Sequence, residues 1–190
     1  MADFTLVCAP PLAGYTRQNG TLGLRAPDDL AIVSIALPLG QEAAAQRAIA
    51  AAYGVALPEI GQTALAGEGN DTRLLRLGSD LAFVLFSCAT PDAETRVAAL
   101  LNGAAYTTDQ SDVWCALVLS GPQSRAVLER ICPLDLHDSA FGVGAVARTM
   151  MEHLGVIIIR TDPDSYLLLS ASSSAQSFLH ALETSVANVL

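Results

Sequence analysis

The amino-acid sequence predicts an α+β fold made of two duplicated halves of the βαββα type, related by pseudo-two-fold symmetry. The main observation is the order strand, helix, loop, hairpin, helix, which occurs twice along the 190 residues. One added strand is expected in the second copy. Residue identity between the copies is low, so the repeat rests on element order. We expect residues 1–25 to form an N-terminal arm, 26–104 the first half and 105–190 the second, together one compact domain.

The first half begins with a buried strand, because residues 30–37 form a short apolar run. An Ala-rich segment then predicts a helix that ends at Gly54. Residues 55–71 are expected to be a loop, and residues 72–87 a hairpin that turns at Gly78-Ser79-Asp80.

A helix closes the first half, with Thr90 as its cap, Pro91 at its first position and Gly103 as its stop. Its expected buried stripe consists of Val97, Leu100 and Leu101. A linker follows and contains the letters TTDQSD.

The second half repeats this order. The run VWCALVLSG predicts a strand, and Pro122 opens a short helix whose inward residues are Val127, Leu128 and Ile131. After an irregular loop to Gly144, three apolar runs predict strands, AVARTMME, GVIIIR and SYLLLSA, joined by turns at residues 153–155 and at TDPD. A C-terminal amphipathic helix buries Phe178, Leu182, Val186 and Val189.

The charge content excludes several classes of function. The net charge is −9 and no basic patch is present, which disfavours nucleic-acid binding. All ten basic residues are Arg, so lysine Schiff-base chemistry and a phosphate-loop lysine are excluded. Only 15% of the residues are charged. This low value fits either an Ala-rich chain or a surface that a partner covers.

The sequence also lacks the usual signals for membranes and metals. No secretory signal opens the chain, and its longest later apolar run, LGVIII, is far below a spanning length. We therefore expect a soluble, cytoplasmic protein. Cys8, Cys88, Cys115 and Cys132 show no paired spacing, so neither a disulfide framework nor a metal site is expected.

A Cys, an Asp and a His lie close together at Cys132, Asp135 and His137. A thiol enzyme would need a base within hydrogen-bond reach of Cys132, which this spacing does not guarantee. Pro133 disfavours helical angles at the preceding residue, so a structural helix stop is the favoured interpretation. No catalytic residue is assigned from the sequence.

Four residues are candidate ligand or interface contacts: Tyr106, Trp114, Arg148 and Tyr166. The aromatic rings could stack on a flat ligand such as a pterin, while the arginine could grip a carboxylate. Core or interface packing is the favoured alternative for the aromatic residues.

The segment DQSDVWCALVLSGPQSRAVLERICPLDLH carries a family resemblance. It combines an Asp-x-Ser opening, an apolar strand, a Ser-Gly-Pro turn, a short helix and a Cys-Pro-Leu-Asp-Leu tail. This combination resembles the gamma subunits of heterotetrameric sarcosine oxidase. The resemblance continues to the C-terminal helix and includes TRLLRLGSDLAFVLF in the first half. More distantly, the chain is similar to the folate-binding domain of the glycine-cleavage T protein and other aminomethyltransferases.

The resemblance implies an accessory, non-catalytic subunit of a complex that oxidatively demethylates sarcosine to glycine. Formaldehyde or methylene-tetrahydrofolate and hydrogen peroxide would be the other products. The implied partners are the alpha, beta and delta subunits. FAD, FMN, NAD and tetrahydrofolate would belong to the complex, and none is expected on this chain alone.

The sequence departs from both families. The first-half hairpin has none of the tryptophans common in gamma subunits, and the segment MEHLGV has Glu152 but no Asp, which argues against aminomethyltransferase activity. A free-standing folate-binding protein related to aminomethyltransferases stays open as the alternative function.

Overall fold

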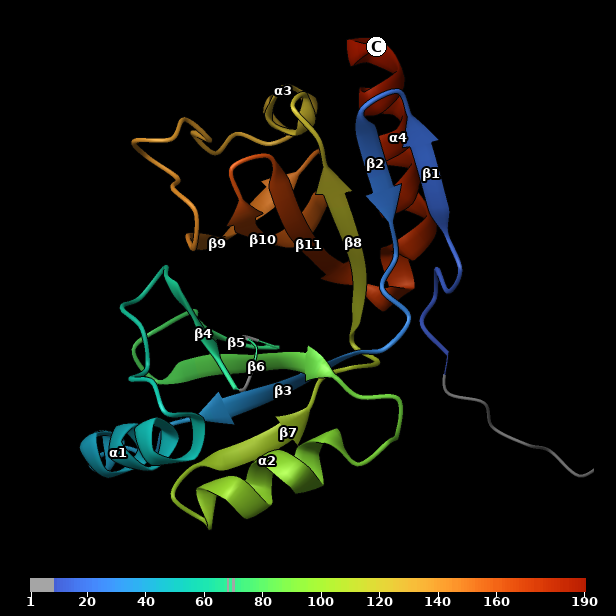
Figure 1. Ribbon diagram of the computed structural model, residues 1–190. Coiled ribbons are helices and arrows are strands. Elements are labelled where there is room, and N and C mark those ends of the chain that lie inside the picture. The colour runs from blue at the N-terminus through green and yellow to red at the C-terminus, as the bar shows by residue number, and fades with distance from the viewer. Residues whose placement is uncertain (1–8, 68, 70) are drawn as a thin grey trace, which may run out of the picture.

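The computed structural model describes residues 9–67, 69 and 71–190 and contains two antiparallel sheets (Figure 1). Sheet A has the order β1-β2-β8-β11-β10-β9, and sheet B the order β4-β5-β6-β3-β7. The expected α+β class is therefore confirmed. Cys8, one of the four cysteines without paired spacing, lies outside the described residues.

Sheet B contains five strands and carries two helices on its outer face (Figure 1). Val33, Val84 and Leu74 pack there against Val97 and Leu101 of the second helix. The strands are β3 (Leu30–Ala36), β4 (Thr63–Ala66), β5 (Thr72–Arg76), β6 (Leu81–Ser87) and β7 (Tyr106–Asp109), and the helices α1 (Glu42–Tyr53) and α2 (Ala93–Leu101).

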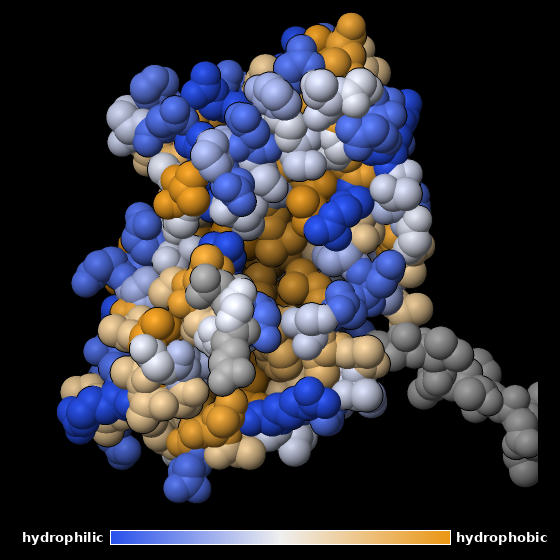
Figure 2. All heavy atoms as spheres, viewed as in Figure 1, coloured by the Kyte–Doolittle hydropathy of each residue, from blue (hydrophilic) through white to orange (hydrophobic). Residues whose placement is uncertain are grey.

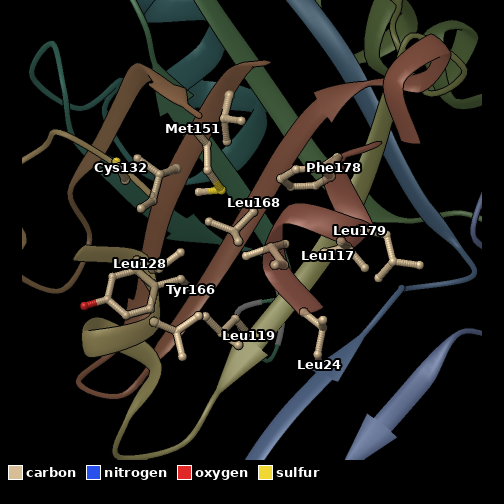
Figure 3. Packing of buried hydrophobic residues seen from close by; sticks show 14 of the residues in the cluster. Leu24, Leu117, Leu119, Leu128, Cys132, Met151, Tyr166, Leu168, Phe178 and Leu179 are labelled. Carbon is tan, nitrogen blue, oxygen red and sulfur yellow. The ribbon is translucent and has the colours of Figure 1, made fainter. Parts of the chain in front are cut away.

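Sheet A contains six strands, and two helices cover its outer face. Leu117 and Leu168 pack there against Phe178 and Leu182 of the C-terminal helix (Figure 3). The strands are β1 (Thr16–Asn19), β2 (Leu22–Arg25), β8 (Trp114–Ser120), β9 (Val146–Met151), β10 (Leu154–Asp162) and β11 (Ser165–Ala171); the helices are α3 (Ser124–Glu129) and α4 (Ala175–Val189), the latter preceded by the short 3-10 turn Ser172–Ser174.

The inner faces of the two sheets pack against each other, which gives four layers in the order helices, sheet, sheet, helices (Figure 1). Ile32 and Leu85 of sheet B meet Ile157, Ile159 and Leu169 of sheet A in a single apolar cluster. This double burial explains why the strands read as continuous apolar runs rather than as alternating ones.

Two expected loops contain strands. The segment 55–71 includes β4, which pairs with β5, so the predicted loop is wrong there. The linker before β8 includes β7, which pairs with β3. With β4 present, the first half has four strands around α1 and α2, as the second half has around α3 and α4. The added strand expected only in the second half is therefore present in both. The element order of each half is βαβββα rather than βαββα.

The two sheets have the same internal connections. In each, the strand before the first helix pairs with the last strand of its own half, as β3 pairs with β6 and β8 with β11. Each of these leading strands also pairs with a strand from elsewhere in the chain, β3 with β7 and β8 with β2. The segments 1–25, 26–104 and 105–190 therefore exchange strands across the expected boundaries, and their status as separate units stays a prediction.

The helix ends agree closely with the expected ones. Gly54 adopts a left-handed conformation after α1, with φ 72°. Helix α2 begins at Ala93, two residues after the expected first position, and the Thr90 side chain bonds Asp92 rather than capping the helix. Leu100 is 55% exposed, so the expected buried stripe contains Val97 and Leu101 but not Leu100.

The chain near the N-terminus is tied to the C-terminal helix. The Tyr15 hydroxyl and the Arg17 guanidinium both donate to Glu183 Oε1, each over 2.8 Å. Burial and the Glu183 carboxylate raise the pKa of Tyr15 to about 12. The hairpin of β1 and β2 therefore forms part of sheet A, held by the pairing of β2 with β8 and by the contacts with α4.

Candidate functional site

The Cys-Asp-His segment follows the end of α3, as the proline predicts. Helix α3 ends at Glu129, and the Cys132 amide donates to the Leu128 carbonyl. Cys132 is 6% exposed and lies in the apolar cluster between sheet A and its helices (Figure 3). Its thiol contacts the Thr149 hydroxyl at 4.0 Å.

His137 has different partners from Cys132. The Asp135 carboxylate accepts the amide proton of His137 over 2.9 Å, and the His137 ring nitrogen Nδ1 lies 2.8 Å from the Ser139 hydroxyl. These contacts form a local turn on the surface. The geometry therefore favours the helix stop over a thiol-imidazole pair.

Arg160 is a buried, charged residue that the sequence analysis did not single out. Its side chain is almost fully buried on β10. The guanidinium donates to the carbonyl oxygens of Phe141 and Pro163, over 2.8 and 2.7 Å, and pairs with Asp138 at 2.7 Å. The available signal was a charged residue directly after the apolar run VIII in GVIIIRTD. Arg160 anchors the irregular loop between α3 and β9.

Asp138 should make stability depend on pH in the acid range. Hydrogen bonding and the charge of Arg160 hold the pKa of Asp138 below its ordinary value of 3.8. Because the folded-state pKa is lowered, this contribution is fully present above the unfolded-state value and is lost as the pH falls through the folded one. We expect Asp138→Asn to flatten the loss of stability below about pH 4, measured by urea unfolding across the acid range. Asp80→Asn, in the exposed turn between β5 and β6, is the matched control; an unchanged acid profile for Asp138→Asn would refute this role.

The structure does not gather the four candidate contact residues into one site. Tyr106 is 70% exposed at the start of the edge strand β7, and Arg148 is exposed on the edge strand β9. Trp114 lies between the sheets and packs edge-on against Phe83, with ring centroids 6.1 Å apart. Tyr166 is fully buried on the helix-facing side of sheet A. Their role as contacts stays a proposal.

Tyr166 is a core residue that supports the Arg160 anchor. Its ring lies beneath the guanidinium carbon of Arg160, 5.7 Å from the ring centroid (Figure 3 shows Tyr166 within the cluster). Burial raises its pKa above the ordinary tyrosine value. Such a cation-π contact adds to the bonds that hold the loop.

The space between the sheets opens into an apolar hollow, visible in Figure 2 as an orange-lined depression. A cavity of about 190 Å³ lies between the sheets, with Leu85 of sheet B and Leu167 of sheet A in its wall. Arg73 lines it, half-buried, and donates to the Thr63 hydroxyl over 3.0 Å. Burial lowers the pKa of Arg73, against the opposing charge of Asp162.

A larger cavity of about 380 Å³ lies against the start of β3, the start of α2 and the loop after β7. Its lining includes Cys88 and several aspartates, among them Asp28 and Asp109. No group of three or more His, Cys, Asp or Glu side chains among the described residues could hold a metal ion. In the part of the chain that is described, no helix is long and apolar enough to cross a membrane.

No family model matches the chain. Sarcosine oxidase gamma subunits are similar to it, at 37% identity over 127 residues for Arthrobacter sp. and 35% over 136 residues for Corynebacterium sp. strain P-1. The chain belongs to the sarcosine oxidase gamma subunit family. The matches cover 66% and 71% of this chain but only 62% and 66% of the respective relatives.

Solved structures agree with this family. The heterotetrameric sarcosine oxidase from Corynebacterium sp. U-96, in complex with pyrrole 2-carboxylate, contains a chain 27% identical to this gamma-family chain, with a TM-score of 0.76. The superposition covers 88% of this chain and 85% of that one. The glycine cleavage system aminomethyltransferase T from Bartonella henselae is 18% identical, with a TM-score of 0.59 over 80% of this chain and 43% of that one, and so shares the fold.

Proposed function

We propose that this chain is an accessory, non-catalytic gamma subunit of a heterotetrameric sarcosine oxidase. The complex would oxidatively demethylate sarcosine to glycine, with formaldehyde or methylene-tetrahydrofolate and hydrogen peroxide as products. The observation that carries the proposal is the similarity to named gamma subunits at 34 to 37% identity. The separate partners of Cys132 and His137 support a structural role, since they leave the thiol without an adjacent base.

In this assignment the chain works in the cytoplasm with alpha, beta and delta subunits. FAD, FMN, NAD and tetrahydrofolate act in the complex, and this chain holds none of them alone. Its task is to stabilise the assembly. The low share of charged residues, 15%, supports a surface that partners cover in part.

We also propose that the two halves are related by duplication and a pseudo-two-fold axis. The matching strand connections of the two sheets support this, as does the reciprocal pairing of β2 with β8 and β7 with β3. The fold shared with an aminomethyltransferase makes a folate-binding protein the natural alternative. The 34 to 37% identity to named gamma subunits favours the accessory role over this alternative.

Co-expression tests the proposal. Tagged wild-type chain is produced together with the alpha, beta and delta subunits of the same organism, and the eluate is assayed for sarcosine-dependent peroxide. We expect a yellow complex that retains all four chains and is active. In a parallel thermal melt, tetrahydrofolate should leave the melting temperature of the isolated chain unchanged, because only a ligand of the native state raises it. A colourless lone chain that tetrahydrofolate stabilises would replace the proposal with the folate-binding alternative.

A further inference from the structure

The smaller cavity, between the two sheets, has apolar walls. Leu85 of β6 is 2% exposed and Leu167 of β11 is 8% exposed, and they line the cavity from opposite sheets. Leu65, 40% exposed, adds a third apolar side chain. The volume of about 190 Å³ is many times the roughly 10–15 Å³ that one water molecule needs. The space is therefore large enough for a molecule of several non-hydrogen atoms.

Arg73 brings a positive charge to this cavity. It lies on the face of β5 that packs toward sheet A, because it pairs with Leu85 and is two residues from Leu75, and both leucines belong to the cluster between the sheets. The guanidinium donates to the Thr63 hydroxyl but takes part in no ion pair with a described residue. Burial lowers the pKa of Arg73, so an anion beside it would offset the lost hydration.

Two aspartates bring negative charge to the same lining. Asp29 accepts a hydrogen bond from the Ser87 hydroxyl, and Asp71 accepts one from the Thr72 hydroxyl. Within the part of the chain that the structure describes, neither aspartate forms an ion pair, with Arg73 or with any other residue. Charges of both signs thus line one apolar cavity without neutralising each other by direct contact.

We propose that this cavity binds a small zwitterionic amino acid. The carboxylate of the ligand pairs with Arg73 and its ammonium group with Asp29, while a short apolar group contacts Leu85. An arginine presents parallel N–H donors that match a carboxylate, and a few converging polar groups among apolar walls are typical of small-molecule sites. A ligand with a single charge would satisfy only one side of the cavity. The site is additional to the proposed function and does not depend on it.

Chemical-shift titration of the isotope-labelled full chain tests the site. The probes are N-methylglycine and alanine, and the controls are acetate and methylamine, which carry one charge each. We expect both amino acids to shift the Arg73 side-chain Nε–H signal and the amide signals of Leu85 and Leu167 along saturating curves. The controls should bind at least about tenfold more weakly, because each lacks one charge-assisted contact. The amide of Ala93, which lines the larger cavity beside α2, should not shift.

Charge-removing variants locate the site. Arg73→Met and Asp29→Asn each remove one charge from the lining, and the asparagine keeps an acceptor for the Ser87 hydroxyl. Arg148→Met and Asp80→Asn are the matched controls outside the cavity. Circular dichroism melts check that all four variants fold. We expect each cavity variant to weaken binding of N-methylglycine at least about tenfold, and the controls to leave it unchanged.

Three results would each overturn the site: no saturating shift in the wild type, controls that bind as tightly as the amino acids, or folded cavity variants that bind like the wild type. The first two need no variant. Saturation is required because small osmolytes also act on proteins by exclusion from the surface, without occupying a site. Assembly with the other subunits is measured separately, so a failure of this site leaves the proposed function standing.

Discussion

Gly121→Ala should lower the melting temperature substantially. Among the described glycines, the effect should exceed that of an Ala substitution at any position where the added Cβ meets open space. Gly121 has φ +121°, a conformation that side chains rarely adopt, and an added Cβ would lie 2.3 Å from the Thr21 carbonyl oxygen. Because that atom is backbone, the clash cannot be relieved by rotating a side chain. The strain and the overpacking together should cost about 3 kcal/mol, or roughly 6–12 °C for a chain of this length.

The physical reason is the contact between the Ser-Gly-Pro turn and the first hairpin. The Gly121 amide donates to the Asp164 carbonyl over 2.8 Å, which holds the turn in place, while Gly23 of β2 pairs with Ser120. Gly103→Ala is the matched control, since Gly103 has φ +78° but nothing within 4 Å of an added Cβ. It should cost only about 1 kcal/mol. Equal melting temperatures for the two variants would show that the close approach to Thr21 is not a constraint.

Arg160→Met should destabilise the protein about as much as Gly121→Ala. It removes a buried guanidinium that bonds two carbonyl oxygens and the Asp138 carboxylate. We expect a loss of about 2–4 kcal/mol, because charge-assisted hydrogen bonds are worth more than neutral ones. The loop between α3 and β9 loses two of them, to Phe141 and Asp138, and the turn after β10 loses the one to Pro163. Urea unfolding measures the loss.

Two further variants make the Arg160 test specific. Arg160→Lys should not restore stability, since a single ammonium cannot reproduce the planar fork of donors. Arg148→Met removes an exposed arginine from β9 and should change stability by less than about 0.5 kcal/mol. If Arg160→Met unfolds at the same urea concentration as Arg148→Met, the loop between α3 and β9 does not depend on this anchor.

Much of the fold follows from apolar periodicity and helix signals. The strands β3, β6, β8, β10 and β11 are strongly apolar because sheet and helix layers bury both of their faces, and such runs are easy to find. Gly54 ends α1 in the expected left-handed conformation. The Ser-Gly-Pro turn is also visible in the sequence, although its contact with the first hairpin is not.

Two of the missed strands, β4 and β7, are short and lie at the edges of sheet B. Strand β4 has the sequence TALA and β7 the sequence YTTD, so neither presents an apolar run. Their pairing comes from neighbours distant in sequence, β5 for one and β3 for the other. An edge strand has one unpaired side and needs little apolar surface, so sequence patterns give it a weak signal.

The site residues were harder to predict than the fold. Trp114 and Tyr166 are aromatic residues at strand positions, and the sequence alone does not say which face of β8 or β11 meets the other sheet. The two cavities are lined by segments around residues 29, 71 and 109, which only the folded chain brings near one another. Arg160 was missed because its partners, Asp138 and two carbonyl oxygens, are tertiary contacts.

Purification that follows enzyme activity, with no tag on this chain, tests whether the chain is an accessory subunit of a sarcosine oxidase. The enzyme is purified from the source cells by following sarcosine-dependent peroxide formation. The most active fraction is then examined by native mass spectrometry and visible absorption. We expect a flavin-containing complex that includes this chain in one copy. An active, flavin-containing fraction without this chain, together with the chain eluting alone elsewhere, would contradict the assignment as an accessory subunit.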